Sequence, residues 1–156
     1  MNTDILSSLY KQYTKQEPQS IDALPGAGSN RRYYRLNGVQ RLIGVCGTSV
    51  EENKAFVYMA QHFSEKGLPV PKVYAVADDC SAYLQEDLGN SLLFDCIANG
   101  RKNGDFSTEE TELLKTVIRL LPRLQFEGDR EMDYSVCYPQ PEFNRRSILW
   151  DLNYFK

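Results

Sequence analysis

The spacing of apolar residues along the chain predicts a series of short helices and strands. Apolar residues recur three or four positions apart in the first fifteen residues, over Glu51–Lys66 and after Ser107, a spacing typical of helices with one buried face. Ser107 and Glu110 form a capping box at the start of the third helix, which Pro122 should end or kink. A last helix is expected from Ile148 onwards.

Four further runs have the alternation and the residue types of strands. Asn37-Gly38 separates the first two runs and is a strong hairpin signal. The predicted sheet is therefore four-stranded and mostly antiparallel, with one helix inserted after its second strand. The predicted class is α+β, because strands meet through hairpins and do not alternate with helices. After the sheet, the polar residues 99–105 predict a loop. The four runs are the strand that ends at Leu36, then Arg41–Val45, Pro71–Ala77 and Ala82–Glu86.

The stretch Leu24–Leu36, LPGAGSNRRYYRL, suggests a chemistry. It sets Gly26 and Gly28 directly before a basic, aromatic strand. Glycines at such a bend let backbone N–H groups approach a phosphate closely, and the three arginines that follow supply the opposite charge. A phosphate-handling loop is therefore the first functional hypothesis.

Composition narrows the class of protein. The chain has 156 residues, enough for one domain, with 42% hydrophobic residues, 25% charged residues and a net charge of -3. It has no apolar run of the roughly 18 residues that a membrane span needs and no secretory signal, so we expect a cytoplasmic protein without a membrane partner. The mildly acidic balance argues against nucleic acid as a partner. Four scattered cysteines and the single His62 predict no metal site.

Four stretches carry motifs in a characteristic order: GAGSNRRYYRL at 26–36, EEN at 51–53, GLPVPKVY at 67–74 and YLQEDLG at 83–89. Together they resemble the N-terminal lobe of the aminoglycoside phosphotransferase and choline kinase family, the small-molecule relatives of protein kinases. The glycine loop is most similar to that of the branch that phosphorylates the amino sugars N-acetylmuramate or N-acetylglucosamine. The resemblance covers residues 24–95 well and residues 96–156 only loosely.

The resemblance implies an ATP site, with Mg²⁺ in the intact protein. The glycine loop would lie over the phosphates, and the backbone of Gln85–Leu88 would bond the adenine edge. Glu52 would have the position from which such kinases reach a strand lysine that holds the phosphates. Each of these three parts also has a purely structural interpretation. The glycines would form an ordinary turn, Gln85–Leu88 would be the end of a strand before a turn at Gly89, and Glu52 would be a solvated acid at the start of a helix. The implied nucleotide-binding residues are Gly26, Ala27, Gly28, Ser29, Asn30, Arg32, Glu52, Gln85, Glu86, Asp87 and Leu88.

The sequence departs from the family pattern in two places. Where the family has a strand lysine, residues 42–47 read LIGVCG, so either an arginine such as Arg32 or Arg41 takes its place or nucleotide binding is weaker than usual. The only histidine, His62, lies in a predicted helix and is not followed by the Asp of a catalytic loop. No catalytic residue and no metal ligand can therefore be assigned.

These departures and the last residues, ILWDLNYFK, lead us to expect a fragment of a longer kinase, inactive by itself. Its expected parts are a helix and connector at 1–23, a kinase-like nucleotide-binding lobe at 24–95, and a mostly helical linker with the start of a second lobe at 96–156. The small-molecule acceptor would bind the full-length protein. An uncovered apolar face at Trp150, Tyr154 and Phe155 would favour a homodimer.

Two other function classes are compatible with the residues. A non-catalytic binding or regulatory module with the shape of the lobe would explain the missing lysine. Single-stranded nucleic-acid binding would use the Arg31–Arg35 cluster, but strand alternation sets Tyr33 and Tyr34 on opposite faces, where they cannot form one stacking platform.

Overall fold

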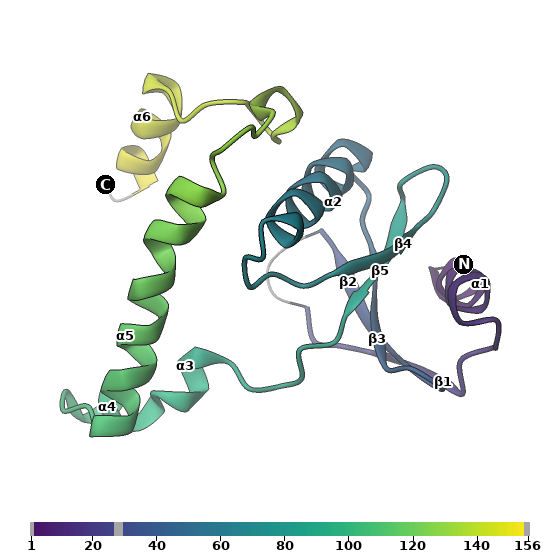
Figure 1. The fold of residues 1–156 in the computed structure, drawn as a ribbon, viewed down its shortest axis with the longest axis horizontal. Coiled ribbons are helices and arrows are strands. Elements are labelled where there is room, and N and C mark those ends of the chain that lie inside the picture. The colour runs from purple at the N-terminus through teal and green to yellow at the C-terminus, as the bar shows by residue number, and fades with distance from the viewer. Residues whose placement is uncertain (1, 27–29, 155–156) are drawn as a thin grey trace.

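The computed structural model describes residues 2–26 and 30–154 and has an α+β fold (Figure 1). Within these residues, five strands form one antiparallel sheet in the order β1-β2-β3-β5-β4. The predicted class is therefore confirmed, although we expected four strands. The strands are β1 (Ser20–Ala23), β2 (Arg32–Asn37), β3 (Leu42–Cys46), β4 (Val73–Val76) and β5 (Ala82–Glu86).

The helices lie before, within and after this sheet. The helices expected in the first fifteen residues, over 51–66, after Ser107 and from Ile148 onwards are all present. Among the described residues, no helix has both the length and the apolar character needed to cross a membrane. The helices are α1 (Asn2–Thr14), α2 (Val50–Glu65), α3 (Leu93–Cys96), α4 (Ala98–Asn103), α5 (Thr108–Pro122) and α6 (Arg145–Tyr154), with a π-helical turn η1 (Arg123–Glu127) and a 3-10 turn η2 (Tyr134–Val136).

The unexpected strand is β1, which pairs antiparallel with β2 so that Ile21 lies opposite Leu36. The glycine segment therefore connects β1 to β2, and the sheet begins before residue 24, where we expected the lobe to start. Sequence patterning does not identify β1 because it has only four residues and lies between Pro18 and Pro25. Its pairing depends on β2, which a local pattern does not contain.

Two helices cover opposite faces of the sheet, as Figure 1 shows. The apolar side of α1 is buried on one face and the apolar side of α2 on the other, so each face of β3 is covered and all five of its residues are buried. The α1-side core comprises Leu6, Leu9, Tyr10, Leu36, Leu42, Cys46, Ala77, Ala82 and Leu84. The α2-side core comprises Ile43, Val45 and Tyr83, with Phe56 and Val57 of α2 among the residues packed against it.

Gly44 in β3 permits the close packing of α1. A Cβ atom at this position would lie 2.7 Å from Leu36 Cδ1 and 2.8 Å from Leu6 Cδ2. Because both leucines are fully buried, neither has space to move aside. The glycine in this strand is thus explained by packing.

The first turn of α2 is fixed to the sheet by polar contacts. The Ser49 side chain caps the helix by accepting a hydrogen bond from the backbone N–H of Glu52 at 3.2 Å. Asn53 is buried, and its amide donates to the carbonyl oxygens of Cys80 at 2.8 Å and Gly47 at 3.3 Å. Glu52 therefore occupies a well-determined position at the start of this helix.

The far end of α2 contacts the C-terminal half. The Tyr58 hydroxyl accepts a hydrogen bond from the backbone N–H of Asp133 at 2.6 Å, and His62 Nε2 donates to the carbonyl of Gly128 at 2.7 Å. His62, which the sequence places in a helix, lies in α2 and has a structural partner in Gly128.

In the C-terminal half, the predicted loop at 99–105 is largely helical, because α4 covers Ala98–Asn103. The Glu110 carboxylate explains this difference: it accepts hydrogen bonds from the N–H of Gly100 at 3.0 Å and of Ser107 at 2.9 Å. The second of these bonds belongs to the predicted capping box of α5, which is confirmed. A contact ten residues distant thus overrides a composition typical of loops.

Candidate functional site

The side chains of the basic segment alternate between the two faces of the sheet. Tyr33 packs against the α2-side core and Tyr34 against the α1-side core, which confirms that they lie on opposite faces. Arg31 and Arg35 have the same parity as Tyr33 and contact groups on the α2 side and at the end of β5. The α2 side of the sheet therefore carries two positively charged side chains, one at each end of this segment.

The first of these, Arg31, forms an ion pair with Glu52. The distance from Arg31 Nη2 to Glu52 Oε1 is 2.8 Å, and the two side chains are 14% and 32% exposed. The guanidinium group also lies 5.2 Å from the centre of the Phe56 ring, which stacks on Tyr83 at 5.1 Å. Partial burial and the aromatic face make this pair stronger than an exposed surface pair.

The basic side chain beside Glu52 is not one of the two arginines that we named as substitutes for the strand lysine. We expected either that Arg32 or Arg41 takes the place of the lysine or that nucleotide binding is weaker than usual, and in the structure Glu52 pairs with Arg31. Arg41 pairs with Asp87, and Arg32 lines a cavity of about 130 Å³ that also contains Ile5 of α1. The reason is the alternation of side chains along the segment, which directs Arg31 and Arg32 to different faces.

Val45 of β3 contributes no charge to this side of the sheet. It is fully buried in the α2-side core, opposite Tyr33 in the register of β2 and β3. On this face β3 therefore supplies apolar contacts. The positive charge beside Glu52 comes from Arg31, one residue before β2 begins.

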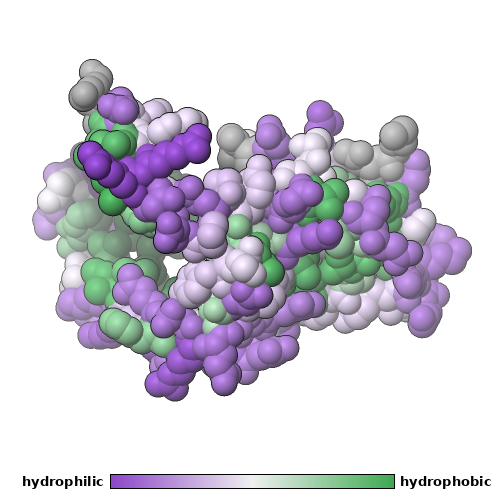
Figure 2. Space-filling view, turned by 90° about the horizontal axis from the view of Figure 1, so that it is seen from above, coloured by the Kyte–Doolittle hydropathy of each residue, from purple (hydrophilic) through white to green (hydrophobic). Residues whose placement is uncertain are grey.

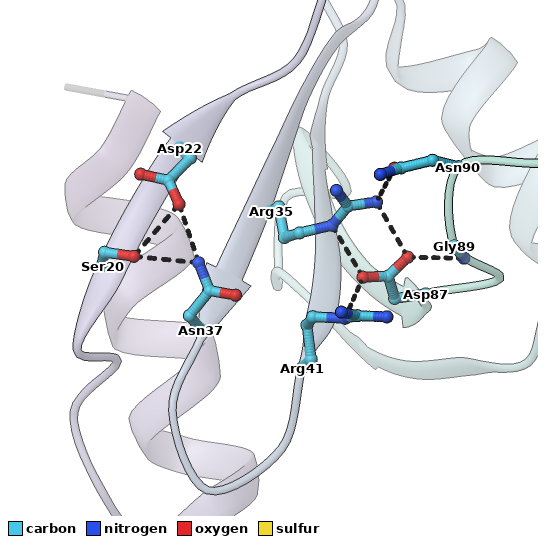
Figure 3. A network of polar contacts seen from close by, with 8 residues as sticks. All are labelled: Ser20, Asp22, Arg35, Asn37, Arg41, Asp87, Gly89 and Asn90. Carbon is cyan, nitrogen blue, oxygen red and sulfur yellow. Dashed lines mark hydrogen bonds and ion pairs between the residues drawn. The ribbon is translucent and has the colours of Figure 1, made fainter.

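The second positively charged side chain, Arg35, lies at the carboxylate of Asp87, directly after β5 (Figure 3). Arg35 binds it with two hydrogen bonds, from Nε to Oδ2 at 2.7 Å and from Nη2 to Oδ1 at 3.1 Å. Arg41 Nε lies 2.7 Å from Oδ2, and the backbone N–H of Gly89 donates to Oδ1 at 2.8 Å. Asn90 accepts a further hydrogen bond from Arg35. The Asp87 side chain is only 2% exposed, so these contacts fix the chain after β5 to β2 and β3.

Opposing effects set the pKa of Asp87. Burial by itself would raise the pKa of the carboxyl group. The hydrogen bonds from Arg35 and Gly89 and the charges of Arg35 and Arg41 outweigh burial, so the pKa lies below its usual value. Asp87 is therefore ionised at neutral pH.

Burial also dominates at Tyr83, the aromatic residue beneath Phe56. It raises the pKa of the Tyr83 hydroxyl well above its usual value, whereas the nearby Arg31 charge acts in the opposite direction. Tyr83 is fully buried and stays neutral, and its ring supports the stack under the Arg31 guanidinium.

The predicted hinge residues differ in the groups they leave accessible. The N–H of Glu86 donates to the carbonyl of Lys72 at 2.8 Å, and the Asp87 side chain is held by the two arginines. Leu88 is 68% exposed. Gln85 is half-buried at the end of β5, in register with Ile43.

The glycine loop is described only in part. Gly26 has open space around the position of a Cβ atom, and Asn30 lines the same small cavity as Arg32. The predicted residues Ala27, Gly28 and Ser29 lie outside the described residues.

Sequence reasoning did not assign Arg31 to the pair with Glu52 or Arg35 to Asp87. Strand alternation from Tyr33 was the available signal, since it sets Arg31, Tyr33 and Arg35 on one face.

In residues 2–26 and 30–154, no group of three or more His, Cys, Asp or Glu side chains is placed to hold a metal ion. Comparisons of the chain with models of protein families and with curated proteins find no match.

Proposed function

We propose that residues 20–90 form the nucleotide-binding lobe of a small-molecule phosphotransferase, with ATP as the nucleotide and a hydroxyl group as the phosphate acceptor. An amino sugar is the acceptor class that the sequence resemblance suggests. This chain contains no His-x-Asp motif, so we expect it to bind nucleotide weakly and to transfer no phosphate.

The order of the elements supports this proposal. The glycine segment joins two antiparallel strands, a helix is inserted between β3 and β4, and the chain leaves the sheet after β5 through the EDLG motif. In kinase-type sites, a glycine loop covers the phosphates, while a basic side chain pairs with an acid on the inserted helix. In this chain the glycine segment lies between β1 and β2, and Arg31 pairs with Glu52 at the start of the inserted helix α2.

The Arg31–Glu52 ion pair is the observation that carries the proposal. A carboxylate at the start of the inserted helix holds a cation directly after the glycine loop, which is the position from which a cation meets nucleotide phosphates. An arginine has a wider, planar group than lysine and binds phosphate oxygens with two donors at once. The missing strand lysine is thus compatible with nucleotide binding.

The contacts of Asp87 support the proposed hinge. Its side chain is directed to Arg35 and Arg41, which leaves the backbone groups of residues 87–89, apart from the Gly89 N–H, for contacts with a base. Ile43 and Val45 of β3 belong to the buried α2-side core, so contacts with a base would come from the backbone after β5.

The alternative is a lobe that binds a partner and no nucleotide, favoured by the fully buried Val45 in place of a lysine. Isothermal titration calorimetry with ATP and Mg²⁺ separates the two. The proposal predicts saturable binding in the high micromolar to millimolar range, and no transfer of labelled phosphate to N-acetylglucosamine. Absence of ATP binding would contradict it and favour the alternative.

A further inference from the structure

Helix α5 carries an apolar face that is open to solvent along most of its length. Leu113, Val117, Ile118 and Leu121 are 39–63% exposed. Figure 1 shows α5 apart from the sheet, and Figure 2 shows apolar side chains reaching the surface at the end of the molecule that carries α5 and α6. A helix of about fifteen residues is only marginally stable in water, and most of its stability in proteins comes from packing of its apolar face. This face therefore requires a partner.

The apolar residues of α5 are spaced as in the seam of a coiled coil. Leu113, Val117 and Leu120 are separated by four and then three positions, which sets them in one line along the helix. We call these three residues the seam. Leu114 and Leu121, one heptad apart, widen the apolar surface on one side of it. A seam of this spacing packs against another helix that has the same spacing.

The charges of α5 are sorted along the helix axis. Glu109 and Glu112 precede the middle of the helix, and Arg119 and Arg123 follow it. Glu109 and Arg123 are fourteen positions apart, which is two heptads, so they flank the seam on the same side, one at each end. An antiparallel second copy would place a basic end opposite each acidic start. A parallel copy would set like charges against each other at both ends.

The contacts that α5 makes within the chain leave this surface available. Helix α4 contacts α5 in its first turn, where the buried Glu110 carboxylate accepts the hydrogen bond from Gly100. Further along, Arg123 pairs with Glu127 at 3.2 Å, and these two side chains are 46% and 39% exposed. Because so exposed an ion pair contributes little to stability, Arg123 can exchange Glu127 for the carboxylate of a partner.

The charge of α5 argues against a membrane as the partner. Helices that lie on anionic membranes carry mostly lysine and arginine on their polar face. The range Thr108–Pro122 contains three glutamates and only two basic residues, so its formal charge is negative. The heptad spacing and the sorted charges instead fit a second copy of the same helix.

We propose that two copies of the 156-residue chain associate through α5, with the two helices antiparallel and related by a two-fold axis. The seams pack against each other, and Glu109 of each copy pairs with Arg123 of the partner subunit. At about 1.5 Å per residue the contact is short. It lies near the low end of specific interfaces, which bury about 1,200–2,000 Å², so we expect a dissociation constant in the micromolar range. The dimer does not depend on nucleotide binding.

Sedimentation velocity of the full chain across the micromolar range tests this association. The mass should rise from 17.9 kDa, that of one chain, to twice this value. Val117→Glu should raise the dissociation constant at least about 100-fold, because it sets two carboxylates in the desolvated seam. Val39→Glu makes the same change at a position that is 58% exposed between β2 and β3, and it should leave the dimer unchanged. Thermal unfolding checks that each variant is folded.

Charge reversal tests the orientation of the helices. Glu109→Lys or Arg123→Glu alone should weaken the dimer about tenfold, since the two-fold axis makes each change create two pairs of like charge. The double variant should restore the wild-type affinity, because both pairs again have opposite charges. In a parallel dimer each residue would face its own copy, so the single variants would not weaken association.

A chain that stays monomeric throughout the micromolar range would overturn the proposal. A dimer that survives Val117→Glu, or one that is lost with Trp150→Glu but not with Val117→Glu, would place the contact elsewhere, in the second case on α6. Unchanged affinity in both single charge variants would contradict the antiparallel orientation. Binding of the monomer to vesicles of phosphatidylcholine and phosphatidylserine would assign the face to a membrane and refute the dimer.

Discussion

Replacement of Asp87 by alanine is expected to lower the free energy of unfolding by about 3–5 kcal/mol, the usual result when one partner of a buried ion pair is removed. The variant leaves Arg35 without its bidentate partner, although the Arg35 side chain is only 16% exposed. It also removes the hydrogen bond that the Gly89 N–H donates. Chemical denaturation with urea at neutral pH measures the difference.

The same carboxylate makes stability depend on pH. Because the pKa of Asp87 is lower in the folded protein than in the unfolded chain, its contribution is complete above the usual pKa of a carboxyl group. The contribution is lost as the pH falls through the folded-state pKa. The difference in unfolding free energy between wild type and Asp87→Ala should therefore shrink at acidic pH.

Asp22 provides the matched control (Figure 3). It is an exposed aspartate of the same sheet, and it accepts hydrogen bonds from the neutral side chains of Ser20 and Asn37. Asp22→Ala should cost only about 0.5–1.5 kcal/mol, as expected for neutral partners near the surface. An equal loss in the two variants would contradict the role that we give to the arginines around Asp87.

The second large effect concerns nucleotide affinity. Arg31→Gln should weaken ATP binding about 10- to 100-fold, since a hydrogen bond to a charged group contributes about 1.5–3 kcal/mol. The guanidinium group is already held by Glu52 and the Phe56 ring, so it loses little freedom when a phosphate binds. Titration calorimetry of both proteins with ATP and Mg²⁺ measures the ratio.

The neighbouring arginine supplies the control. Arg32→Gln removes the same charge one residue away, on the α1 side of the sheet, and should leave ATP affinity nearly unchanged. Arg31→Lys should retain part of the affinity, because the charge remains but the planar donor fork is lost. If Arg32→Gln weakened binding as much as Arg31→Gln, the phosphates would lie on the other face of the sheet, and the proposed site would be wrong.

The elements with strong local signals could be predicted from the sequence. The helices α1, α2 and α5 have clear apolar periodicity. The predicted hairpin between β2 and β3 is present, although β2 includes Asn37 and the connection runs over residues 38–41. The strand β5 was expected at Ala82–Glu86 and lies there. These elements form where local preference and tertiary packing agree.

The features that sequence reasoning missed depend on distant partners. β1 is held by pairing with β2, and α4 is held by the Glu110 carboxylate, so neither has a sufficient local signal. The choice between Arg31, Arg32 and Arg41 required knowledge of which face α2 covers, and the contacts of Asp87 span more than fifty residues. A pattern limited to neighbouring positions cannot contain these contacts.

The most direct test of the central claim, that nucleotide binds on the α2 side of the sheet, is to map ATP and Mg²⁺ onto the backbone amides by NMR. We predict concentration-dependent shifts at Gly26, Arg31, Leu88 and Gly89, which flank the glycine loop and follow β5. The β4–β5 turn around Asp79, where Ser81 is bonded to its carboxylate, should not respond. Absence of shifts, or shifts confined to that turn and to α1, would contradict the account.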